Sequence, residues 1–151
     1  MDYTGVRRLE ARLGEIMSDT IILKIDEVPV HARGDGVEST LLVAKERCGA
    51  PFTSGITRFP AGKKVPMHSH NCDEQVTILE GSAEVELDGK RTPVSVMDTT
   101  YVEAGKPHRF INTGDGPLVI LWVYAADEVT RTFIESGETV AHMSEGDVIT
   151  K

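Results

Sequence analysis

The sequence has few aromatic residues, few cysteines and no long apolar run. Aromatic residues make up 5% of its 151 residues, and there are two cysteines. The longest apolar stretch, residues 118–126, is much shorter than the roughly 20 residues that a membrane-spanning helix requires, so we expect no membrane segment. Cys48 and Cys72 do not form a C-x-x-C pair, and we expect both to be free thiols in a reducing compartment.

Basic residues are also scarce. The chain carries 16 Lys and Arg against 24 Asp and Glu, which gives a formal net charge of −8. Phosphate backbones are bound mainly through clustered Lys and Arg, so we expect no nucleic-acid partner. The N-terminal stretch lacks the apolar run of a signal peptide, and we expect a cytoplasmic protein. A composition with 40% hydrophobic and 26% charged residues is typical of one soluble globular domain and excludes a disordered chain.

Short β-forming runs dominate the chain after a first helical pattern. Residues 5–17 place apolar side chains at helical spacing and predict a short amphipathic helix. From residue 20 onward, β-runs alternate with turn residues, at 20–25, 39–45, 52–59, 74–79, 83–87, 99–102, 108–112 and 118–124. Asp88-Gly89 is a strong type I′ hairpin signal. The pattern predicts an all-β sandwich or barrel, with residues 138–149 as a short helix or a surface tail.

Three histidines and one glutamate have a spacing that indicates a candidate metal site. His68 and His70 are two residues apart, so on a strand both imidazoles project from one face and can converge on one metal ion. Glu74 begins the next β-run and can supply an anionic oxygen ligand. His108 starts a later strand, directly after the turn residues 105–107. A bare His-x-His pair also occurs as a plain surface feature, so the wider pattern decides its meaning.

The wider pattern resembles the cupin superfamily, in particular its small single-domain cupin 2 type. Residues 62–81 read Gly, five residues, His-x-His, three residues, Glu, six residues, Gly, which matches the first cupin motif. Residues 105–112 read Gly-x-x-His-x-x-x-Asn, which matches part of the second. Met97 and Glu103 depart from that second motif, where the family usually has Gly and Pro. The resemblance covers roughly residues 50–125.

The resemblance implies a fold and a division of the chain. The expected fold is a double-stranded β-helix, or jelly-roll, barrel. We expect the barrel over residues 37–126, an N-terminal arm with a short helix and a strand over residues 1–36, and a C-terminal extension over residues 127–151. Small cupins of this type commonly form homodimers through their N-terminal strands, and residues 1–30 are long enough to do so.

The resemblance also implies one divalent metal ion inside the barrel, bound by His68, His70, Glu74 and His108. Such a donor set suits Fe, Mn, Ni, Co, Cu or Zn, and it leaves positions open for a small-molecule substrate or O2. The first hypothesis, ranked just ahead of the second, is therefore a non-haem-iron dioxygenase. The second is a redox-neutral isomerase, lyase or decarboxylase that acts on a sugar acid or another small oxygenated metabolite. The third is a non-catalytic barrel that binds a ligand through the metal; the open positions favour an enzyme.

Three further residues are candidate acid–base groups near the barrel mouth, namely Tyr101, Glu103 and Tyr124. Trp122 shares a strand face with Tyr124, and the pair is expected to pack in the core or to form a pocket wall. Cys72 is interpreted as a small, partly buried loop residue rather than a metal ligand.

Among the remaining polar candidates, Asn112 and Arg58 each have two interpretations, and two histidines have none. Asn112 shares the strand parity of His108 and Phe110, so it is expected inside the barrel, where it either orients a ligand or satisfies backbone groups. Arg58 is interpreted as a solvated strand residue, with an anchor for an anionic substrate as the alternative. His31 and His142 have no partner that the sequence identifies.

Overall fold

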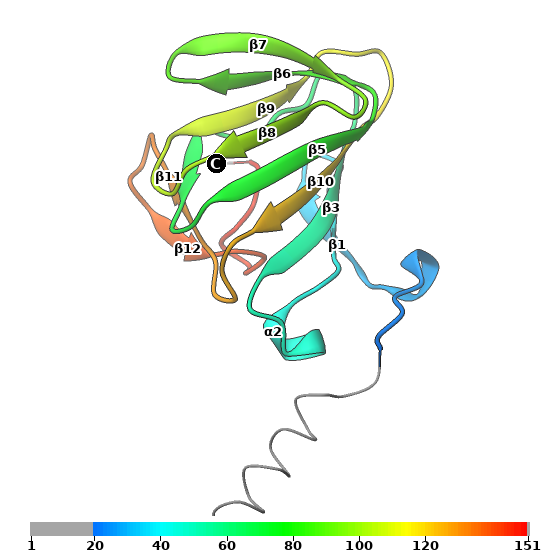
Figure 1. The fold of residues 1–151 in the computed structure, drawn as a ribbon. Coiled ribbons are helices and arrows are strands. Elements are labelled where there is room, and N and C mark those ends of the chain that lie inside the picture. The colour runs from blue at the N-terminus through cyan, green and yellow to red at the C-terminus, as the bar shows by residue number, and fades with distance from the viewer. Residues whose placement is uncertain (1–19, 151) are drawn as a thin grey trace, which may run out of the picture.

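The structure is a computed structural model, and it describes residues 20–150. The helix predicted over residues 5–17 lies outside the described part. Within residues 20–150, twelve strands and two short helical segments follow one another (Figure 1). The helical segments are η1 Ile25–Glu27 and α2 Lys45–Cys48. The strands are β1 Val30–Gly34, β2 Val37–Leu41, β3 Thr53–Phe59, β4 His68–His70, β5 Glu74–Glu80, β6 Ser82–Leu87, β7 Lys90–Ser95, β8 Thr99–Val102, β9 His108–Asn112, β10 Leu118–Tyr124, β11 Thr130–Phe133 and β12 Thr139–Ala141.

The strands form two antiparallel sheets of six strands each. One sheet has the order β1-β2-β3-β10-β5-β8, and the other has the order β12-β11-β4-β9-β6-β7. The inward faces of both sheets supply one core, with Val76, Ile78 and Ile120 from the first sheet and Val85 and Phe110 from the second. The predicted all-β, double-sheet jelly-roll barrel is therefore confirmed. No helix within residues 20–150 is long and apolar enough to cross a membrane.

Two turns show how local sequence sets the strand connections. The β6–β7 hairpin turns at Asp88 and Gly89, whose φ angles of 53° and 73° fit the predicted type I′ turn. Met97, between β7 and β8, has a φ of 73° and is 72% exposed. This is the position where the related motif usually has Gly, and the backbone keeps the left-handed conformation that Gly adopts most easily.

Two of the predicted elements are wrong. Residues 20–25 form no strand, and the chain instead enters η1 at Ile25. Ile21 and Ile22 are exposed, so this β-forming run has no neighbouring strand to pair with, and β-propensity alone does not hold a strand. Residues 138–149 form neither a helix nor a free tail, because β12 pairs with β11 and the following turns return to the barrel.

The segment after β10 adds strands to the sheet that carries the histidine pair. β11 pairs with β4, with Arg131 opposite His70 and Phe133 opposite His68. The amide of Ile149 then donates a 2.8 Å hydrogen bond to the carbonyl of Arg33 at the end of β1. The C-terminal end of the described chain therefore lies beside β1, and Ile149 lines the interior cavity of the barrel.

Candidate metal centre

The second sheet brings the three histidines together. His68 and His70 are the first and last residues of β4, a strand held between β11 and β9. His108 starts β9 and lies directly opposite His68 in the β4–β9 register. The three side chains point into the barrel, and each residue is at most 4% exposed. One ring nitrogen from each lies within 4.8 Å of the others, close enough for one ion to be bound by all three.

Glu74 reaches the same point from the opposite sheet. It is the first residue of β5 and is 4% exposed. One carboxylate oxygen, Oε1, lies 3.0 Å from Nε2 of His108, and the other, Oε2, lies 3.3 Å from Nε2 of His70. The structure therefore places all four residues expected as ligands in one buried cluster.

Backbone carbonyls fix the orientation of each imidazole. Nδ1 of His68 lies 2.7 Å from the Pro66 oxygen, Nδ1 of His70 lies 2.9 Å from the Thr130 oxygen, and Nδ1 of His108 lies 2.8 Å from the Lys106 oxygen. A carbonyl can only accept, so each Nδ1 carries the proton. The Nε2 atoms are left facing the cluster, which is how metal-binding histidines are usually held by their second nitrogen.

The charges in the cluster suit a cation. Burial, reinforced by the charge of Arg131, holds the pKa of His68 well below its ordinary value, so this imidazole is neutral at neutral pH. Burial tends to raise the pKa of Glu74, but hydrogen bonds from His108 and His70 outweigh it and hold the pKa well below the ordinary range. Burial likewise opposes the charge of His108, yet contact with Glu74 raises the pKa of His108. Glu74 therefore stays ionised, and the adjacent His108 holds the compensating proton.

A divalent transition metal fits this donor set. Imidazole nitrogens with one carboxylate oxygen are donors of intermediate softness, which Fe, Mn, Ni, Co, Cu and Zn accept. The Nε2 atoms are pre-oriented by their carbonyl partners, and Glu74 supplies negative charge in a buried place where an ion would replace the proton of His108. His68, His70, Glu74 and His108 are the residues that would bind it.

A small cavity adjoins the cluster. Its volume is about 30 Å³, room for roughly two water molecules, and His68, Glu74, Phe110, Trp122 and Tyr124 are among its lining residues. The hydroxyl of Tyr124 lies 3.3 Å from Nε2 of His70. Burial raises the pKa of Tyr124 well above its ordinary value, so the phenol keeps its proton. Of the three acid–base candidates, Tyr124 is the one that the structure brings to the site.

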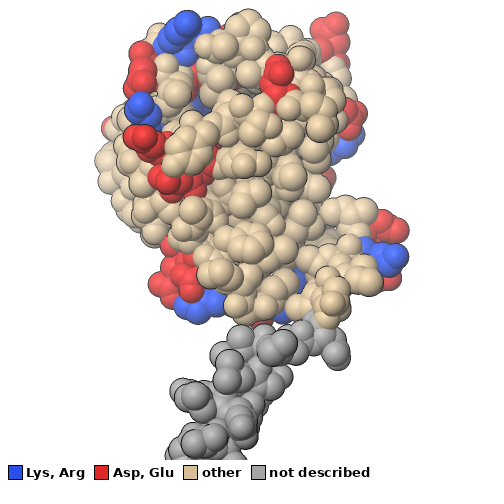
Figure 2. All heavy atoms as spheres, in the orientation of Figure 1, with Lys and Arg blue, Asp and Glu red and all other residues tan. Residues whose placement is uncertain are grey.

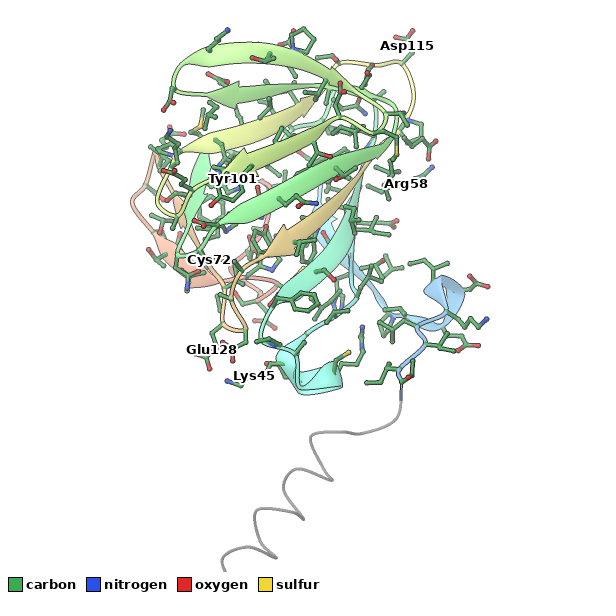
Figure 3. All side chains as sticks on the ribbon, viewed as in Figure 1. Lys45, Arg58, Cys72, Tyr101, Asp115 and Glu128 are labelled. Atoms are coloured by element: carbon green, nitrogen blue, oxygen red, sulfur yellow. The ribbon has the colours of Figure 1, made fainter. Side chains whose placement is uncertain are left out.

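The other two acid–base candidates lie outside the barrel. Tyr101 is 64% exposed, and its hydroxyl donates a 2.6 Å hydrogen bond to the carboxylate of Asp73 on the outer surface (Figure 3). Glu103 is exposed in the turn that follows β8. Arg58 also points to the outside (Figure 3), as expected of a solvated strand arginine. Its Nη1 lies 3.7 Å from Oε2 of Glu80, and both side chains are exposed. His31 is exposed on β1.

Asn112 and Cys72 have structural roles in this arrangement. The Asn112 amide nitrogen donates to the carbonyl oxygens of Phe59, Pro60 and Gly116, at 2.9–3.2 Å, and its Oδ1 accepts from the amide of Gly114. Asn112 therefore satisfies backbone groups at the end of β9, one of its two interpretations. Cys72 is buried, and burial raises the pKa of its thiol to about 11, which keeps it protonated.

His142 is a fourth histidine near the cluster, half-buried, for which the sequence identifies no partner. Its ring lies 4.9 Å from the rings of both Trp122 and Tyr124 and 6.1 Å from that of His70, centroid to centroid. Its Nε2 has no hydrogen-bond partner among residues 20–150. The loose pattern after residue 125 gives no local signal for this contact, which depends on the C-terminal turns folding back onto the barrel.

The fold and the buried cluster define a jelly-roll barrel with a candidate metal centre between its sheets. Residues 55–124 match the cupin domain family. This match shows that residues 55–124 are a domain of the cupin superfamily, and similar solved structures share its jelly-roll architecture.

Known proteins similar to this chain have diverse descriptions. An uncharacterised protein of Methanocaldococcus jannaschii is 38% identical over 63 residues, which are 41% of this chain and 50% of that protein. The polyketide synthase CurC of Streptomyces cyaneus is 26% identical over 95 residues, which are 62% of each chain. The chain therefore spans about half to three-fifths of these relatives. The structure of the polyketide cyclase RemF from Streptomyces resistomycificus has a TM-score of 0.65 at 18% identity, covering 85% of this chain and 90% of that one.

Proposed function

We propose that this protein is a metal-dependent enzyme that carries out a redox-neutral reaction on a small oxygenated metabolite. His68, His70, Glu74 and His108 would bind one divalent ion. The observation that carries the proposal is the orientation of the three imidazoles. Their Nδ1 atoms donate to backbone carbonyls, and Nε2 of His108 and of His70 lie 3.0 and 3.3 Å from the Glu74 carboxylate. When bound, the ion polarises an oxygen atom of the substrate as a Lewis acid.

The protein's own residues supply the rest of the chemistry. Tyr124 keeps its proton at neutral pH and presents it beside His70, so it can donate a hydrogen bond or a proton to a substrate oxygen that gains negative charge. Phe110 and Trp122 form apolar walls of the cavity and exclude bulk water. In such an enclosed site a hydrogen bond to a developing negative charge is stronger than in water.

The comparisons favour redox-neutral chemistry over oxygenation. The solved structures with this fold include a sugar phosphate isomerase from the cupin superfamily of Silicibacter pomeroyi, 23% identical, with a TM-score of 0.61 and coverage of 86% of this chain and 97% of that one. They also include the polyketide cyclase described above. These names describe an isomerisation and a cyclisation, and neither names an oxidation. At these identities the likeness concerns the fold, and the reaction on this chain is our proposal.

An anaerobic turnover screen tests the proposal. Protein loaded with Zn, Mn, Ni or Fe(II) is incubated with sugars, sugar acids, 2-oxo acids and diketones, once without O2 and once in a parallel aerobic series, and each mixture is followed by proton NMR in D2O. We expect conversion, or deuterium uptake next to a carbonyl, which is lost in His70→Ala and reduced in Tyr124→Phe. Conversion that requires O2 would instead establish the dioxygenase hypothesis. Ligands that bind and are never converted would establish the non-catalytic barrel.

We also propose that the protein forms a homodimer through the outer face of its first sheet. Leu79 on β5 and Tyr101 on β8 are 39% and 64% exposed on this face, and Val96 and Met97 lie exposed in the turn before β8. Figure 2 shows a broad area over β5, β10 and β3 that is almost free of charged side chains. Light scattering after size exclusion should give about twice the chain mass of 16.5 kDa. A mass equal to one chain would refute the dimer.

A further inference from the structure

Two buried arginines share the interior with the metal centre. Arg33, from the end of β1, is 4% exposed, and Arg131, from β11, is 5% exposed. Both line the same small cavity as His68 and Glu74. Buried guanidinium groups are rare unless they are paired, so each needs a reason to be there.

Asp147 pairs with both arginines but neutralises only one of them. Its Oδ2 lies 2.7 Å from Nη2 of Arg33, and its Oδ1 lies 3.0 Å from Nη1 of Arg131. Asp147 is fully buried, and its Oδ2 also accepts a hydrogen bond from the amide of Met143. Two guanidinium groups and one carboxylate leave one positive charge beside the cavity.

The two arginines differ in how well they are hydrogen-bonded. Nε of Arg33 donates to the carbonyl of Asp147 at 2.8 Å, and its Nη1 donates to Ser39 at 3.1 Å. Its Nη2 contacts Asp147 without hydrogen-bond alignment, but two of its three nitrogens are satisfied within the structure. Nε of Arg131 has no hydrogen-bond partner among residues 20–150, and its Nη1 contact with Asp147 is not aligned for a hydrogen bond. A buried donor without an acceptor is costly, and a bound ligand is one way to satisfy it.

The position of Arg131 directs these free donors toward the metal centre. Arg131 lies opposite His70 in the β4–β11 register, and directly opposed residues of an antiparallel pair project from the same face. Its side chain therefore enters the barrel beside the histidines rather than the solvent. The fork of a guanidinium matches the two oxygens of a carboxylate, which bind it through paired charge-assisted hydrogen bonds.

We propose that Arg131 is the anion-binding residue of the cavity and that the substrate is a small oxygenated carboxylic acid. Its carboxylate binds the Arg131 guanidinium, and another of its oxygens faces the cluster of His68, His70, Glu74 and His108. This substrate class rests on the proposed function, but the anion site itself is a property of the chain. Asp147 contacts Nη1 of Arg131 and leaves its Nε free.

Formate binding to the metal-free protein tests the site separately from the metal. Formate is a carboxylate of a size that a cavity of about 30 Å³ admits, and formamide is its neutral counterpart. Trp122 is the only tryptophan and lines the same cavity, so its indole N–H gives one isolated NMR signal that reports binding. We expect saturable shifts with formate and about tenfold weaker binding of formamide.

Arg131→Gln is the deciding variant, with Arg58→Gln as the matched control on the outer surface. We expect Arg131→Gln to weaken formate binding about tenfold and to leave formamide binding unchanged, while Arg58→Gln binds both as the wild type does. If Arg131→Gln fails to fold, Arg131→Lys decides, because it keeps the charge and loses the fork, and weaker formate binding is again expected. A folded variant at position 131 that binds formate like the wild type would overturn the proposal and leave Arg131 as an anchor for Asp147.

Metal binding gives the separate readout for the proposed function. Cobalt(II) absorption is recorded for the wild type and for Arg131→Gln. Both proteins should bind the ion, because Arg131 is not among the expected ligands. Absence of cobalt binding in the wild type would refute the proposed function, whereas an unchanged formate affinity in the variant would refute the anion site.

Discussion

Gly55→Ala is expected to disturb the cavity through one added methyl group. Gly55 is buried in β3 and lies opposite Trp122 in the β3–β10 register. A Cβ built at Gly55 would lie 2.3 Å from Cζ2 and 2.4 Å from Cη2 of Trp122, and 2.5 Å from the carbonyl oxygen of Thr40. Carbon atoms do not approach so closely, and β3 is paired on both sides, by β2 and β10, so its backbone has little room to move.

The cost of this methyl group has two parts. Overpacking a dense core costs about 1–3 kcal/mol. Displacing the indole also breaks the 2.9 Å hydrogen bond from Nε1 of Trp122 to Thr57, which is worth about 1 kcal/mol. We therefore expect a loss of about 2–4 kcal/mol in the free energy of unfolding, or a melting temperature lower by about 4–16 °C.

Urea unfolding followed by Trp122 fluorescence measures this loss, because the same tryptophan reports both the stability and its own displacement. Gly116→Ala is the matched control, since a Cβ there meets no atom within 4 Å, and it should be close to neutral. A Gly55→Ala protein with the stability and the fluorescence spectrum of the wild type would refute the packing that we assign to the cavity wall.

Three further predictions concern buried polar groups. At pH 8, iodoacetamide should modify Cys72 about 100-fold more slowly than an unshifted thiol, because its pKa is about 11, and mass spectrometry of a Cys48→Ser protein measures the rate. Asn112→Ala should lower the free energy of unfolding by about 1–3 kcal/mol, since it leaves three carbonyls and one amide without their partner; urea unfolding with unchanged stability would contradict this. Burial and the nearby Arg131 and Arg33 charges hold the pKa of His142 well below its ordinary value, so the unfolded chain takes up a proton near pH 6.5 that the folded chain does not. Stability of the metal-free protein should therefore fall as the pH drops below about 6.5, less steeply in His142→Phe by up to about 1.4 kcal/mol per pH unit, and equal slopes in chemical denaturation would contradict it.

The metal cluster and most strands could be predicted from the sequence because their signals are local. Two histidines at a spacing of two residues must share a face once they lie on a strand, and β4 has this form. The Asp88-Gly89 turn fixes the β6–β7 hairpin by its own backbone preference. Long apolar runs such as residues 118–124 require burial on at least one face, and β10 lies within its sheet between β3 and β5.

The rest depended on pairing between distant segments. β11 and β12 are short, with the sequences TRTF and TVA, and their own residues do not distinguish them from a loop until β4 provides a partner. Arg131 and His142 reach the interior through this pairing, so no local pattern marks them. Tyr101 shows the reverse case, because its face on β8 depends on the register with β5, and that register turns it outward.

Metal stoichiometry tests whether His68, His70, Glu74 and His108 bind one divalent ion. Metal-free protein is reloaded with zinc, cobalt or iron(II), passed through a desalting column and analysed by elemental mass spectrometry. The account predicts one ion per chain in the wild type and in His31→Ala, whose histidine is exposed on β1, and loss of the ion in His68→Ala and His70→Ala. A folded wild type that retains no ion after reloading, or His68→Ala and His70→Ala proteins that retain it fully, would contradict the account.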